Sequence, residues 1–219
     1  KLISSTLFGS VSDDFAQKLS LTENGNIAVT GYSGRDGTFI FTEDAVQNEN
    51  KGGYDIFLSI FNSELDELKY STLIGGEKDD FGSSVNYANG FKISGITYSD
   101  DLPVTPNAFQ KELNGGQNNL KSDAFLMQLN KTSYQIEHLT YFGGAAEDKA
   151  YASEVSADSS VYVCGYTESV NMPVFDDSFD KEYNKDFPLS TYSDVFAVKF
   201  SKDLSHVEKF TYLGADGTE

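Results

Sequence analysis

The sequence lacks the residues on which several protein classes depend. A single cysteine excludes a disulfide framework within the chain, and too few soft ligands are present for a zinc ribbon. No run of about 20 apolar residues occurs, so we expect no membrane insertion. The chain has 16 basic and 34 acidic side chains, and the net charge of −18 argues against nucleic acid, anionic membranes and polyanionic substrates as partners.

Other residue types are plentiful. The 219 residues include no tryptophan and only one arginine, but they contain 19 glycines, 17 phenylalanines and 13 tyrosines. Hydrophobic residues make up 39% of the chain, which is enough for a folded core and is not typical of a disordered protein.

An internal repeat organises the whole chain. Its first anchor is a short apolar run ending in glycine and followed by acidic residues, with the aligned glycines spaced by 66, 68 and 71 residues: Gly9, Gly75, Gly143 and Gly214. A second anchor recurs at Gly31, Gly95 and Gly165. A third, Asp-x-Phe, recurs at Asp55, Asp123 and Asp194. Several anchors in one fixed order indicate a repeat architecture.

Each copy predicts four strands and no helix. The first strands, at 15–21, 81–87 and 149–155, show partial alternation of apolar and polar residues. A turn follows, signalled best by Asn24-Gly25 and Asn89-Gly90, and leads to the second strand. After a polar connection of 23 to 28 residues the third strand starts at Asp-x-Phe, and a short turn leads to the fourth, such as 67–73.

Four antiparallel strands per repeat, in chain order, are typical of a β-propeller blade. Both faces of the second strand carry apolar or amphipathic residues, as a sheet covered on two sides requires. The glycines of the second anchor predict a close approach of neighbouring backbones or a bend in the strand.

The predicted fold class is therefore all-β, with about three blades forming an open arc of a larger propeller. We expect 1–8 to be the last strand of a preceding blade, 9–74, 75–142 and 143–213 to be blades, and 214–219 to begin another. An arc leaves two sheet faces open, so the remaining blades are expected from the same chain or from a partner chain.

The anchors also resemble a known family. The best matches lie at 140–144, 161–167 and 123–129, and Ala108-Phe109-Gln110 adds a match in a long connection. Together they resemble the SBBP family of β-propeller repeats over nearly the whole chain. The resemblance implies a large secreted or surface protein, often bacterial, without shared catalytic residues. Two positions depart from the pattern, because Ser10 follows Gly9 and Lys149 replaces an aromatic residue.

Acidic pairs recur at the link between successive copies. Carboxylates beside glycine carbonyls suit Ca²⁺, although none of the three links has the spacing of an EF-hand loop. The candidate calcium ligands are Asp13, Asp14, Asp79, Asp80, Glu147 and Asp148. The alternative is that one acid of each pair accepts backbone N–H bonds and fixes the turn. We expect no other cofactor.

The links 9–14, 75–80 and 143–148 and the long connections 32–54, 96–122 and 166–193 should lie at one end of the blades, here called the acidic face. They hold 20 acidic and 7 basic side chains, so they carry 13 of the 18 net negative charges. Such a face attracts cations, basic partners or polar glycans, or it simply keeps the protein dissolved. The candidate ligand-binding aromatics are Tyr98, Phe109, Tyr183, Phe187 and Tyr192; alternatively, they pack the connections onto their own blades.

Catalytic motifs are not evident. His138 and His206 do not lie beside a nucleophile motif, and no Gly-x-Ser-x-Gly elbow occurs. We therefore expect a non-enzymatic scaffold or adhesion module of a secreted or cell-surface protein, which binds a protein or glycan at a cell surface. The alternatives are a glycoside hydrolase or lyase with carboxylates on the acidic face, and a Ca²⁺-stabilised spacer.

Overall fold

The computed structural model describes residues 1–35, 37–114, 122–183 and 193–214. This part of the chain is all-β, as predicted, and contains twelve strands and no helix. None of its segments is therefore a helix able to span a bilayer. The strands are β1 (Asp14–Leu21), β2 (Ile27–Gly34), β3 (Tyr54–Phe61), β4 (Leu68–Ile74), β5 (Asp80–Tyr87), β6 (Phe91–Thr97), β7 (Asp123–Leu129), β8 (Ile136–Phe142), β9 (Asp148–Val155), β10 (Val161–Thr167), β11 (Asp194–Phe200) and β12 (Val207–Leu213).

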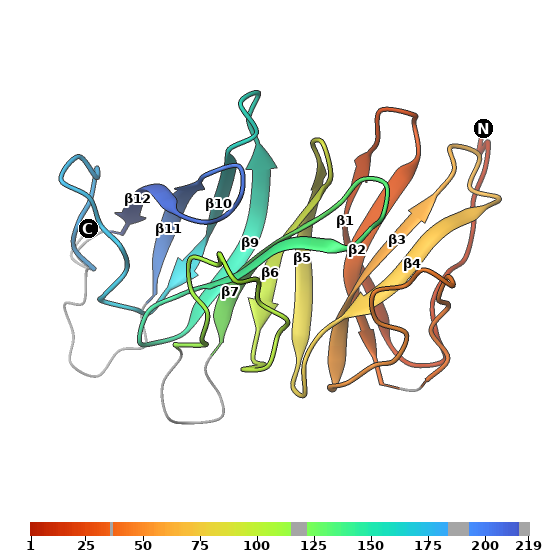
Figure 1. The fold of residues 1–219 in the computed structure, drawn as a ribbon, viewed down its shortest axis with the longest axis horizontal. Helices are drawn as coiled ribbons and strands as arrows, with labels where there is room; N and C mark the ends of the chain where they lie inside the picture. The colour runs from red at the N-terminus through yellow and green to blue at the C-terminus, as the bar shows by residue number, and fades with distance from the viewer. Residues whose placement is uncertain (36, 115–121, 184–192, 215–219) are drawn as a thin grey trace.

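The strands form three antiparallel sheets of four. The first sheet is β1–β4, the second β5–β8 and the third β9–β12, and strand order equals chain order in each. The sheets lie side by side in chain order (Figure 1). The prediction of repeated four-stranded antiparallel sheets is confirmed, and the three sheets do not close into a ring.

The first strand of each sheet, here called its inner strand, begins one residue earlier than predicted; these strands are β1, β5 and β9. Their first residue is the second acid of each acidic pair, and it pairs with the end of the second strand: Asp14 with Ser33, Asp80 with Thr97 and Asp148 with Thr167. The aspartate thus belongs to the sheet as well as to the link. A polar residue at a strand start gives no apolar signal, which is why the alternation pattern missed it.

The glycines of the second anchor lie opposite a β-bulge in each inner strand. In the first sheet the register slips between Ala16 and Lys18, directly opposite Gly31. A Cβ atom would lie about 2 Å from the carbonyl oxygen of the facing strand, with distances of 1.8 Å for Gly31 to Phe15, 2.0 Å for Gly95 to Phe81 and 1.8 Å for Gly165 to Lys149. No side chain fits there, so the predicted close backbone approach is confirmed.

Apolar side chains fill the space between successive sheets. The first sheet contributes Ile56, Leu58 and Tyr70 to a core that it shares with the second sheet. The second sheet contributes Leu126 and Phe142 to the core that it shares with the third. The second sheet is therefore buried on both faces, as predicted from the two apolar faces of its strands.

The turn between the third and fourth strand reaches back over the preceding sheet. In the second sheet this turn carries Tyr134, whose ring stacks on Tyr70 of the first sheet with centroids 4.1 Å apart. Leu204 occupies the corresponding turn of the third sheet and is buried in the core shared with the second. Both residues have positive φ values, 56° and 55°. No sequence pattern indicated this contact.

The outer faces of the first and third sheets are open. An apolar hollow of about 470 Å³ lies on the first sheet between Phe8, Val29, Phe57 and Leu65. Residues 1–8 form no strand here, and Phe8 packs edge-on against Phe39 at 5.2 Å. Their assignment to a preceding blade stays a prediction. The segment predicted to begin a following blade lies outside the described residues, apart from Gly214.

Candidate functional site

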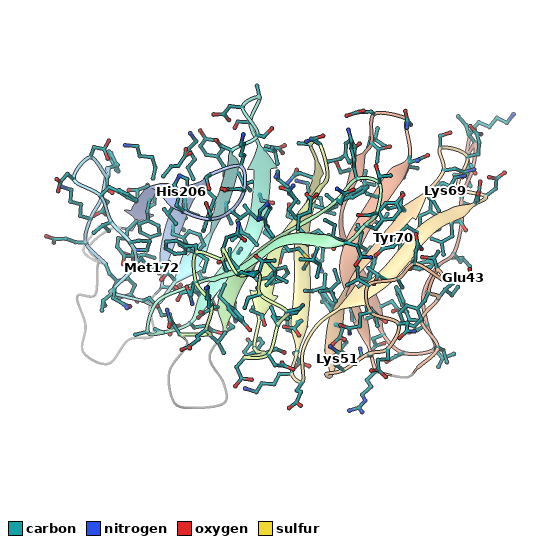
Figure 2. The ribbon with its side chains drawn as sticks, viewed as in Figure 1. Glu43, Lys51, Lys69, Tyr70, Met172 and His206 are labelled. Atoms are coloured by element: carbon teal, nitrogen blue, oxygen red, sulfur yellow. The ribbon has the colours of Figure 1, made fainter. Side chains whose placement is uncertain are left out.

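The links lie together at one end of the three sheets. The described parts of the long connections start from that end but run along the fourth strands, where Asn107 bonds His138 at 3.2 Å and Asp177 pairs with Lys209. This end is at the bottom of Figure 1, where each inner strand begins. Lys51, in the first long connection, lies at this end, whereas His206, in the turn before β12, lies toward the other (Figure 2). The structure thus brings the three links together, whereas parts of the long connections lie nearer the other end.

The second acid of each pair closes the link by hydrogen bonding. Asp80 Oδ2 accepts the backbone N–H of Gly76 at 2.8 Å, and Asp148 Oδ2 accepts that of Gly144 at 2.7 Å. In the first sheet Asp14 Oδ2 accepts the N–H of Ser10 at 2.5 Å. Each bond joins residues four apart, which is the turn-fixing geometry that we gave as the alternative to calcium.

A serine supplies a further donor to two of these carboxylates. Ser99 Oγ donates to Asp80 and Ser169 Oγ donates to Asp148, both at 2.8 Å. Burial raises the pKa of Asp80 to about 7 and that of Asp148 to about 6, although these hydrogen bonds lower both. The cause is the loss of hydration around a charged carboxylate.

The aspartate of Asp-x-Phe has a similar structural role. Asp55 Oδ2 accepts hydrogen bonds from Gln47 Nε2 at 2.7 Å and from the Lys51 backbone at 2.9 Å. Asp123 Oδ2 accepts them from Gln110 Nε2 at 2.6 Å and from the Asn114 backbone at 2.9 Å. These bonds fasten the long connection to the start of the third strand.

The first acid of each pair is placed differently in each link. Asp13 is exposed, and Asp79 Oδ1 accepts the backbone N–H of Tyr54 at 3.0 Å. Glu147 pairs with Lys149 at 2.5 Å and accepts a hydrogen bond from the Tyr166 hydroxyl at 3.1 Å. Burial raises the pKa of Glu147, but the bonds from Lys149 and Tyr166 outweigh it and hold that pKa below its ordinary value.

Calcium was predicted at these acidic pairs. Within the described residues no three histidine, cysteine, aspartate or glutamate side chains converge as a metal site. The oxygens that accept link N–H groups already have partners in the chain. The calcium hypothesis therefore stays a prediction that only a binding measurement can test.

The predicted ligand-binding aromatics have separate surroundings. Phe109 packs on Phe200 of the third sheet, with centroids 5.8 Å apart, and is 37% exposed. Tyr183 lies edge-on to Tyr212 at 6.1 Å and is half-buried. Tyr183 thus packs on its own sheet, as the alternative expects, whereas Phe109 contacts both Phe142 of its own sheet and Phe200 of the next. Phe187 and Tyr192 lie outside the described residues.

Tyr98 has different neighbours. Its hydroxyl donates to Glu147 Oε1 at 3.4 Å, its ring lies 6.2 Å from that of Phe81, and the Lys149 ammonium lies 5.9 Å from the ring centroid. The same ammonium lies 5.4 Å from the ring of Tyr166. Lys149 therefore occupies a site formed by two aromatic rings and a carboxylate.

Sequence reasoning missed a polar network that joins all three sheets. Lys18 Nζ donates to Asn86 Oδ1 at 2.9 Å and to the Ser153 carbonyl at 3.0 Å. It also bonds Ser84 Oγ at 3.2 Å. The partners come from β5 and β9 and lie up to 135 residues away, so no local pattern indicated them.

No family model matches the chain, and no curated protein sequence matches it closely enough to count as a relative.

Proposed function

We propose that the chain is an arc of a β-propeller and serves as a non-catalytic scaffold that binds a ligand through its acidic face, in a secreted or cell-surface protein. One observation carries the proposal: three sheets of the same topology stack in chain order, with all their links at one end. Scaffolds that hold variable connections at one end commonly bind ligands there. The resemblance to SBBP repeats supports the cellular setting.

The packing supports the propeller in particular. Each pair of neighbouring sheets shares one hydrophobic core, to which the facing sides of both sheets contribute. The turn before the fourth strand of the second and third sheets also covers the sheet that precedes it. Repeats that bury their faces only against neighbours are stable as a closed or capped array. The open faces of the first and third sheets are the places that further blades, from the same or a partner chain, would cover.

The use of the buried carboxylates supports a scaffold over an enzyme. Asp80 and Asp148 accept backbone N–H groups of their own links, and Asp55 holds a long connection. A glycoside hydrolase instead needs two carboxyl groups directed at one substrate bond. A protein or a glycan remains the expected ligand class for the acidic face.

A binding screen tests the function. The chain is incubated with arrays of oligosaccharides and of basic peptides, and both bound material and released products are measured. The proposal expects saturable binding without product. Double substitution of Glu77→Gln and Asp100→Asn, two exposed acids of the acidic face, should weaken binding several-fold, because each removes an attractive charge.

The matched control neutralises two exposed acids at the opposite end of the sheets, Glu23→Gln and Glu64→Gln. It changes the net charge equally and should leave binding intact. Equal losses in the two double variants would contradict a role for the acidic face. Released product would favour the hydrolase or lyase, and absence of any ligand together with stabilisation by Ca²⁺ would favour the spacer.

A further inference from the structure

A row of aromatic rings crosses all three sheets at the acidic face. Phe15 stacks on Tyr32 at 4.9 Å, Tyr32 meets Phe81 edge-on at 4.8 Å, and Phe81 lies 6.2 Å from Tyr98. In the third sheet Tyr166 lies 5.7 Å from Tyr151. We call these six residues the aromatic row: Phe15, Tyr32, Phe81, Tyr98, Tyr166 and Tyr151.

The row is distinct from the hydrophobic cores. None of its six members belongs to the three clusters that hold the described sheets together. Its two end members are well exposed, Phe15 at 44% and Tyr151 at 53%, and Tyr151 is the bulged residue of β9. Large rings gathered at a surface outside the core mark an interaction site.

The gap in the row between Tyr98 and Tyr166 is filled by a cation. Lys149 stands where the first two copies have Phe15 and Phe81, and its ammonium lies within 6 Å of both flanking ring centroids. Burial lowers the pKa of Lys149, but the bonds with Glu147, Tyr166 and Tyr98 raise it by more, so the side chain is held charged. The row therefore accommodates an ammonium group among its rings.

Carboxylates border the row along its length. Glu147 contacts the hydroxyls of Tyr98 and Tyr166, and Asp79 binds the backbone of Tyr54, whose ring lies 5.7 Å from that of Phe81. Asp13 is exposed and precedes Phe15 by two residues. Rings with carboxylates beside them attract cationic side chains by both cation–π and charge interactions.

We propose that the aromatic row is the ligand-binding surface of the acidic face and that its ligand is a lysine- or arginine-containing peptide segment. The proposal rests on the proposed function and names its site and ligand class. Lys149 shows the mode of binding within the chain. Cationic side chains of the partner occupy the exposed faces of Phe15 and Tyr151 in the same way.

The test uses a labelled octalysine peptide and follows fluorescence anisotropy at an ionic strength of about 0.15 M, where weak long-range attraction is screened. Phe15→Ser and Tyr151→Ser leave the net charge unchanged, and each should weaken binding about five-fold, the effect of one exposed cation–π contact. Tyr151→Phe retains the ring and should bind like the parent chain. Tyr162→Ser is the control, because Tyr162 is 48% exposed, lies outside the row and already has the Lys199 ammonium 5.8 Å from its ring centroid.

Each other outcome overturns the proposal. If both ring variants bind octalysine as tightly as Tyr162→Ser does, charge alone attracts the peptide; the acidic face then retains its function and the row loses its role. If the fully acetylated peptide binds equally well, the ligand is not recognised as a cation. If oligosaccharides bind and octalysine does not, the ligand class is wrong while the proposed function stands.

Discussion

Replacing Asp80 with asparagine should change how the stability of this protein depends on pH. The Asp80 side chain is fully buried, and burial raises its pKa from 3.8 to about 7. The neighbouring carboxylate of Asp55 raises that pKa further, and hydrogen bonds from Thr97, Gly76 and Ser99 lower it. A carboxyl group with a raised folded-state pKa stabilises the fold fully below its unfolded pKa, and that contribution is lost as the pH rises through the folded pKa.

The magnitude follows from the size of this difference. The change from 3.8 to about 7 corresponds to about 4 kcal/mol in full, at 1.36 kcal/mol per pKa unit. Integration of the two titrations assigns about 2.5 kcal/mol of this loss to the interval between pH 5 and pH 8. Asp148, with a pKa of about 6, adds about 1.5 kcal/mol over the same interval.

Urea unfolding at several pH values between these limits, at constant ionic strength, measures the effect. The free energy of unfolding of the parent chain should fall from pH 5 to pH 8, and Asp80→Asn should lose about 2.5 kcal/mol less. Asp100→Asn, which removes one exposed charge from the same face, serves as the control. Parallel curves for the parent and Asp80→Asn would refute the reasoning.

The same assay examines the calcium hypothesis. A divalent cation held by Asp80 would stabilise the folded protein by mass action and would favour the ionised carboxylate. In that case Ca²⁺ should restore stability at pH 8 to the parent chain and not to Asp80→Asn. If the parent chain is equally stable in Ca²⁺ and in a chelator, Asp80 has only the turn-fixing role that its bond to Gly76 indicates.

Two further substitutions test the fold. Gly165→Ala should lower the free energy of unfolding by about 3 kcal/mol or more, since its Cβ would lie 1.8 Å from a backbone oxygen. Gly25→Ala, with open space around the Cβ, should cost about 1 kcal/mol. Equal costs in urea unfolding would contradict this account of the bulge. Lys18→Met should cost about 1–3 kcal/mol, because it leaves the buried side-chain oxygen of Asn86 without its donor. Calorimetry should show a smaller loss for Lys69→Met, whose ammonium pairs with the exposed Glu67. Equal losses would exclude a joining role for Lys18.

The sequence predicted the sheets well because the information is local and repeated. Three copies of each anchor averaged out the ambiguity of any single strand, and Asn89-Gly90 identified a hairpin whose two residues have positive φ values of 53° and 136°. The errors fall where polar residues begin strands, as at Asp80. Glycine at 31, 95 and 165 indicated a close approach, but only the structure shows that the facing strand is bulged there.

The candidate site was less predictable because it depends on the placement of one sheet against the next. The prediction placed exposed aromatics in the long connections, yet Phe109 packs on Phe200 and five of the six rings of the aromatic row lie in strands. The contact between Phe81 and Tyr32 joins two sheets, and the two residues are 49 positions apart in the sequence. Neither alternation nor spacing carries such information, so Tyr98 alone of the row was named from the sequence.

The differences among the copies are more informative about binding than the residues that they share. Asp14, Asp80 and Asp148 recur in every link, and each has a structural reason to recur because it accepts the N–H group that closes its link. Lys149 breaks the pattern in the third sheet, and the fold does not require an aromatic ring there, since the flanking rings accept an ammonium instead. At this position an ammonium group packs between the rings where the other copies have a phenyl ring, so the surroundings accommodate either group. That equivalence is the physical basis for expecting cationic side chains of a partner on the remaining rings.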